Sequence, residues 1–223
     1  MRPQDSILSA GSVQGYVLLL IACGGALLLS IPSGARVAQL MDLQWHPSPI
    51  LFHAAYVVFI ALLGTFRGIT AARWGRPRRR ALLRAASHLL FAQVTVLPCL
   101  FFARALLPGK EYVLPLLVLY SSLAAGMHAM LAFRLELWGR ARGVHTFMLQ
   151  YALFGLILVV PWSLAFVPGA PAAVTLFSPI GVALRITQGP SPTELLIAFA
   201  FVVFVLCWRL IGLRRIDRRP HAV

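Results

Sequence analysis

Residues 112–133 read YVLPLLVLYSSLAAGMHAMLAF, a run without a single charged side chain. A helix needs about 20 apolar residues to cross a hydrocarbon core of about 30 Å. In lipid the backbone must satisfy its hydrogen bonds internally, which favours a helix for such a segment. This run therefore predicts a transmembrane helix.

The rest of the chain repeats this pattern. Of its 223 residues, 60% are hydrophobic and only 12% are charged, which is too little charge to cover the surface of a water-soluble domain. The connections between apolar segments are too short for a separate folded domain. We predict an all-α polytopic membrane protein with one transmembrane domain, residues 1–223, and six transmembrane helices. The predicted spans are 14–32, 49–66, 82–107, 112–133, 146–167 and 193–213.

The first span needs to be distinguished from a secretory signal, because Ser33, Gly34 and Ala35 resemble a cleavage site. Only a weakly positive region with Arg2 precedes the apolar residues 16–31. We therefore expect a retained span.

Two spans begin at recognisable capping signals. Ser48 and Pro49 offer an N-cap followed by proline at the first helical position. Ser191 is followed three residues later by Glu194, the spacing of a capping box. The last span should therefore start near Pro192.

The basic residues indicate the orientation. In this topology sixteen of the 20 Lys and Arg residues lie on one side, together with both termini. An excess of Lys and Arg marks the cytoplasmic side of a membrane protein, so both termini are predicted to be cytoplasmic. The net charge of +14 then reflects topology, and we expect no nucleic-acid partner. The four basic residues on the other side are Arg36, Arg104, Lys110 and Arg185.

The segment 172–189, AAVTLFSPIGVALRITQG, does not fit a simple span. It is apolar but interrupted by Pro179 and Gly181, and it carries Arg185 near its end. Crossing the membrane here would also move the basic C-terminal tail outside. A re-entrant hairpin between the fifth and sixth spans, with its broken backbone buried by neighbouring helices, satisfies both constraints.

The cysteines do not indicate a metal centre. Cys23, Cys99 and Cys207 lie within apolar segments, without a CxxC pair or a His/Cys spacing typical of zinc sites. We expect neither a disulfide nor a bound metal.

The order of these parts resembles a type-2 ABC exporter permease, with six spans, a basic segment after the second span and a re-entrant hairpin before the last. Motif support comes from Arg67-Gly68-Ile69-Thr70, Pro77 and the basic run 78–83, together with Phe177-Ser178-Pro179 in the hairpin. The resemblance implies half of a translocation pathway in the bacterial cytoplasmic (inner) membrane.

The same resemblance implies the partners: a cytoplasmic ATPase dimer, a second permease copy or related chain, and membrane lipid. The chain has no G-x-x-x-x-G-K-[ST] motif, so ATP is expected on the partner, with no cofactor and no enzymatic activity in this chain. Residues 67–84 would form a cytoplasmic coupling segment, a short helix lying along the membrane surface. The expected partner-coupling residues are Arg67, Gly68, Ile69, Thr70, Arg73, Trp74, Arg76 and Pro77.

Polar residues within the spans form a candidate pathway lining. An alternative is that they join helices by hydrogen bonds, each contributing about 0.6 kcal/mol. Apart from Glu194 at a helix start, no carboxylate is expected inside the membrane, which argues against a proton- or sodium-coupled carrier. The candidates are Gln93, Thr95, Ser121, Ser122 and Gln150.

Two histidines support an alternative function. His88 and His128 lie at similar depths near the cytoplasmic ends of the third and fourth spans. Two imidazoles at one level can ligate a haem b, which would make the chain a membrane-anchored haem-binding or quinone-reactive electron-transfer subunit. The simpler interpretation is that each imidazole hydrogen-bonds a neighbouring side chain, a carbonyl or a lipid headgroup.

Overall fold

The computed structural model describes residues 14, 16–21, 23–25, 27, 50–73, 78–105, 110–164 and 172–217, and within this part every regular element is a helix. The described residues of the N-terminal span are helical. The remaining helices are α2 (Ile50–Arg73), α3 (Arg78–Ala105), α4 (Val113–Ala141), α5 (Phe147–Leu164), the 3₁₀ helix η2 (Ala172–Phe177), α6 (Pro179–Gln188) and α7 (Pro192–Asp217). The all-α prediction is confirmed for these residues.

Three of these helices are long and apolar enough to cross a membrane: residues 52–73 of α2, 80–105 of α3 and 113–141 of α4. Shorter apolar stretches follow at residues 148–157 of α5 and 192–208 of α7. Large apolar side chains point outward, such as Leu90 on α3, Met148 on α5 and Phe204 on α7. A surface of this kind is suited to a lipid environment.

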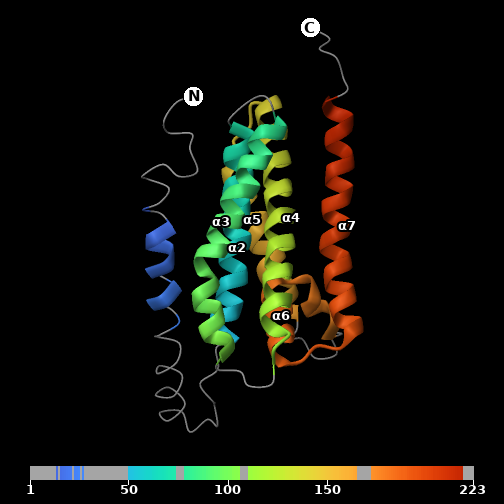
Figure 1. Ribbon diagram of the computed structural model, residues 1–223. Helices are drawn as coiled ribbons and strands as arrows, with labels where there is room; N and C mark the ends of the chain where they lie inside the picture. Colours follow the sequence, from blue (N-terminus) through green and yellow to red (C-terminus); the bar gives the residue numbers. More distant parts are fainter. Residues whose placement is uncertain are drawn as a thin grey trace.

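The helices run side by side with alternating direction (Figure 1). The C-terminal ends of α2, α4 and α7 lie at the same end of the molecule as the N-terminal end of α3. The arginines clustered at these helix ends in the sequence therefore gather at one end, which we call the arginine end.

The centre of the bundle is α4, which packs against α2, α3 and α7. Leu117 and Ala124 of α4 are fully buried, as are Val57 of α2 and Leu100 of α3. On the α7 side, Tyr120 meets the ring of Phe199 edge-on at a centroid distance of 5.7 Å.

The short helices η2 and α6 lie at the opposite end from the arginine end, between α5 and α7 in the chain. Gly181 of α6 approaches η2 so closely that an added Cβ would lie 2.1 Å from the carbonyl oxygen of Thr175. Val182, Ala183 and Ile186 are buried in the same core as α2 and α4. The interrupted segment is therefore two packed short helices.

Polar contacts fix both ends of the connection from α6 to α7. Gly189 ends α6 with φ +108°, a conformation that favours glycine. Lys110 Nζ donates to the Thr187 carbonyl at 2.6 Å. Glu194 N–H donates to Ser191 Oγ, and Ser191 N–H donates to Glu194 Oε2. The predicted capping box and the start of α7 at Pro192 are confirmed; Ser48 and Pro49 lie outside the described residues.

At the arginine end the helices extend beyond the predicted spans. The second span was expected to end at residue 66 and the fourth at residue 133, but α2 continues to Arg73 and α4 to Ala141. Hydropathy detects only the part of a helix that is apolar, whereas these last turns carry arginines and are held by polar contacts. Similarly, α3 begins at Arg78 instead of residue 82.

Candidate functional site

The arginine end is positioned by a close crossing of α2 and α4. An added Cβ on Gly64 would lie 2.3 Å from the Ala125 carbonyl oxygen, and one on Gly68 would lie 2.1 Å from that of Ala129. Gly64 and Gly68 form a G-x-x-x-G pair, whose spacing lets two helix backbones approach closely. This close contact was not predicted from the sequence, although the G-x-x-x-G spacing is present there.

Further along α4, toward the arginine end, the carboxylate of Glu136 joins three helices. Its side chain is only 8% exposed. Oε1 accepts from Arg73 Nε of α2 at 3.0 Å and lies 3.4 Å from Arg140 Nε. Oε2 accepts from Thr146 Oγ1 at 2.7 Å and from Gln150 Nε2 of α5 at 2.9 Å. We call these five residues the Glu136 cluster.

Glu136 was absent from the predicted sites, because hydropathy placed it beyond the end of a span. Its spacing from Arg140, four residues on, is the available signal, since such pairs share one helix face. The pairing with Arg73 depends on tertiary structure. A buried carboxylate requires such partners, and here both oxygens have them.

The turn between α4 and α5 brings Thr146 back onto α4. Gly143 adopts φ +65°, and Val144 N–H donates to the Gly139 carbonyl at 2.8 Å. Gly139 has no space for a side chain, since an added Cβ would lie 2.0 Å from Thr146 Cγ2. The two glycines thus permit the tight return that places the Thr146 hydroxyl at Glu136.

A cavity of about 450 Å³ opens beside the Glu136 cluster. Its walls come from the end of α2, the last turns of α4 and the following turn. Arg73 and Arg140, whose side chains are 53% and 49% exposed, line it together with Glu136. The other lining residues are Gly139, Gly143, Val144, His145 and Thr146.

The structure corrects the expected coupling segment 67–84. Residues 67–73 are the last turns of α2, and residues 78–84 are the first turns of α3, instead of a helix lying along the surface. Ile69 is 6% exposed and Gly68 packs against α4, so neither is presented to a partner. The hydroxyl of Thr70 donates to the Phe66 carbonyl.

The other expected coupling residues divide into two groups. Arg67 belongs to α2, and Arg73 to the Glu136 cluster. Trp74, Arg76 and Pro77 lie outside the described residues.

The expected pathway residues separate into different environments. Gln93 Nε2 of α3 donates to Ser121 Oγ at 3.1 Å, and Ser122 Oγ donates to Gln93 Oε1 at 2.9 Å. Ser121 also bonds Tyr56 Oη of α2 at 3.0 Å. These contacts join α2, α3 and α4. Gln93, Ser121 and Ser122 thus form hydrogen bonds between helices, the alternative to lining a pathway. Thr95 donates to the Phe91 carbonyl of its own helix.

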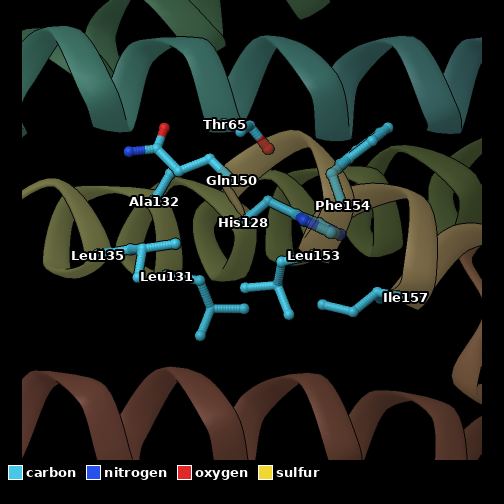
Figure 2. A pocket seen from close by; sticks show the side chains of 9 residues that line it. All are labelled: Thr65, His128, Leu131, Ala132, Leu135, Gln150, Leu153, Phe154 and Ile157. Atoms are coloured by element: carbon cyan, nitrogen blue, oxygen red, sulfur yellow. The ribbon is translucent and has the colours of Figure 1, made fainter. Parts of the chain in front are cut away.

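Gln150, the fifth candidate, belongs to the Glu136 cluster and also lines a small cavity of about 10 Å³ between α2, α4 and α5 (Figure 2). Figure 2 shows its amide directed away from the imidazole of His128. The wall is otherwise largely apolar, with leucines on one side. A cavity of this size holds about one water molecule, so it is no passage for a substrate.

The two histidines of the haem alternative have different neighbours. His88 Nδ1 lies 2.6 Å from Tyr16 Oη of the N-terminal helix. His128 packs edge-on against Phe154 of α5 at 5.2 Å between ring centroids. A bis-histidine haem needs both imidazoles directed at one iron. Each imidazole thus has a neighbour within the bundle, and the electron-transfer alternative stays a prediction.

Neither protein-family models, nor curated proteins, nor solved structures match this chain. Functional inference therefore depends on the helix arrangement and on the arginine end. Within the described residues no group of three or more His, Cys, Asp or Glu side chains could hold a metal ion.

Proposed function

We propose that this chain is the permease subunit of an ABC transporter of the exporter type. It would form half of a translocation pathway, with a second copy or a related chain forming the other half. ATP hydrolysis would take place on a separate cytoplasmic ATPase dimer. In this proposal the chain crosses the bacterial inner membrane six times, with both termini in the cytoplasm.

The observation that carries the proposal is the position of η2 and α6. The pair lies between α5 and α7 in the chain, at the end of the bundle opposite the arginines. A hairpin that enters and leaves on one face keeps the number of crossings even. It also leaves the C-terminal arginines of α7 on the same side as those of α2 and α4, in agreement with the positive-inside rule.

The outer surface of the helix bundle supports burial in lipid and pairing with another transmembrane chain. Leu83 and Phe101 of α3 and Leu196 of α7 are more than half exposed. A surface rich in such side chains is suited to lipid or to another apolar surface. The pathway itself would lie between two chains, since the polar residues expected to line it form hydrogen bonds within this chain.

Coupling to the ATPase would pass through the connection between α2 and α3. This four-residue connection follows Arg73, whose guanidinium contacts Glu136. Glu136 in turn accepts from Thr146 and Gln150 at the start of α5. A displacement of the connection by a docked partner would therefore reach α4 and α5 through one carboxylate.

Capture of the partner tests this function. Affinity-purified chain should retain a nucleotide-hydrolysing subunit with a P-loop, and Trp74→Ala should weaken that retention about 30-fold, since a tryptophan anchor contributes at least about 2 kcal/mol to an interface. The matched control is Trp208→Ala, which changes an exposed tryptophan on α7.

The measurement is quantitative mass spectrometry of the retained subunit, with ATP hydrolysis as a second readout. The proposal fails if no such ATPase is retained. Equal retention by the Trp74 and Trp208 variants would remove the assigned coupling site.

A further inference from the structure

The cavity at the arginine end has the composition of an anion site. Arg73 and Arg140 carry two positive charges into its wall, and Glu136 carries one negative charge. Both carboxylate oxygens already accept bonds from the Glu136 cluster. His145 is the remaining titratable lining residue, and it is exposed. The wall thus keeps a net positive charge without counting His145.

The arginines also have the geometry to bind a phosphate group. Each lies beside Glu136 through its Nε, and about half of each arginine side chain remains exposed in the cavity wall. Guanidinium groups bind phosphate oxygens through pairs of parallel hydrogen bonds. The volume of about 450 Å³ exceeds what a phosphate group alone requires, so a substituent such as a glycerol unit also fits.

The surroundings indicate the level of a membrane interface. Trp138 is 41% exposed near the end of α4, and the Arg142 guanidinium lies 4.6 Å from its ring centroid. Tryptophan is enriched at the boundary between lipid and water, where basic pockets between helices bind anionic headgroups. Apolar Val144, also exposed, lies in the same wall as the arginines.

We propose that this cavity binds a phosphate group, supplied by the headgroup of an anionic lipid or by a soluble phosphate compound. Arg73 and Arg140 hold the phosphate, and Glu136 keeps the two guanidiniums directed into the cavity. The site is independent of ATP and of the transported substrate, so its failure would leave the permease proposal unaffected.

The test uses a variant that leaves the Glu136 cluster intact. His145→Glu adds a negative charge to the cavity wall, and His145→Gln is the matched control without that charge. Purified full-length protein is titrated with phosphatidylglycerol and, separately, with phosphatidylcholine, and bound lipid is counted by native mass spectrometry. A third titration uses inorganic phosphate alone.

We expect saturable binding of phosphatidylglycerol, with phosphatidylcholine at least tenfold weaker. His145→Glu should weaken phosphatidylglycerol binding at least tenfold, while His145→Gln stays within twofold of wild type. Binding of inorganic phosphate alone, lost in His145→Glu, would support the site with a soluble source.

Two further variants distinguish binding in the cavity from general attraction to the positive charge of the surface. Arg140→Gln should weaken binding, whereas Arg142→Gln, which alters the guanidinium beside Trp138, should have little effect. The proposal is overturned if neither probe binds saturably, or if both probes bind the His145→Glu variant as well as wild type. Equal losses in the Arg140 and Arg142 variants would also overturn it.

Discussion

Replacing Gly68 with alanine should lower the stability of the protein, because the new Cβ would lie 2.1 Å from the backbone oxygen of Ala129. That atom belongs to the backbone of α4 and cannot rotate away, so the helices must separate. Overpacking of this kind costs about 1–3 kcal/mol. Gly64→Ala should act in the same way against Ala125. Thermal unfolding in detergent measures the effect.

The control is Gly155→Ala on α5, where an added Cβ meets nothing within 4 Å. Alanine is a better helix former than glycine by about 1 kcal/mol, so this variant should be as stable as wild type or more stable. The two substitutions are chemically identical and are expected to differ in sign. Equal melting temperatures for the Gly68 and Gly155 variants would contradict the close crossing of α2 and α4.

Glu136→Ala should destabilise the arginine end more than any other carboxylate replacement among the described residues. Removing one partner of a buried ion pair costs about 3–5 kcal/mol. Arg73 and Arg140 are about half exposed, so water can solvate them once Glu136 is removed. We therefore expect a smaller loss of unfolding free energy, about 1–3 kcal/mol, which is the range for a buried polar group left without its partner. Loss of amide protection at the start of α5 is the most specific readout.

The matched control is Glu111→Ala. Glu111 also pairs with an arginine, Arg104, at 3.2 Å, but its side chain is 84% exposed. An exposed pair contributes about 0.2–1 kcal/mol, so this variant should unfold close to wild type. If Glu111→Ala and Glu136→Ala have equal effects, the Glu136 cluster does not hold α2, α4 and α5 together.

Local sequence signals predicted the elements that depend on nearby residues. The capping box at Ser191 and Glu194 located the start of α7, because both partners lie within one turn. The interruption at Pro179 and Gly181 located the break between η2 and α6. Apolar runs located the long helices, since hydrophobicity over about 20 residues needs no tertiary information.

The candidate site was harder to predict because its contacts join distant residues. Arg73 and Glu136 are 63 residues apart, and neither is marked by a motif. Ile69 was expected to face a partner, but the crossing of α2 and α4 buries it. Periodicity assigns residues to a helix, whereas the neighbour that each face contacts depends on how the helices pack.

The most direct test concerns the placement of the bundle across the membrane, on which both the coupling route and the phosphate site depend. Single cysteines at Val144, Tyr112 and Thr193, in a variant without the three native cysteines, are treated with an impermeant maleimide in whole cells. We expect labelling at residues 112 and 193 in intact cells, and at residue 144 only after the membrane is opened. Labelling of residues 144 and 193 from the same side would mean that η2 and α6 cross the membrane, and would contradict the account.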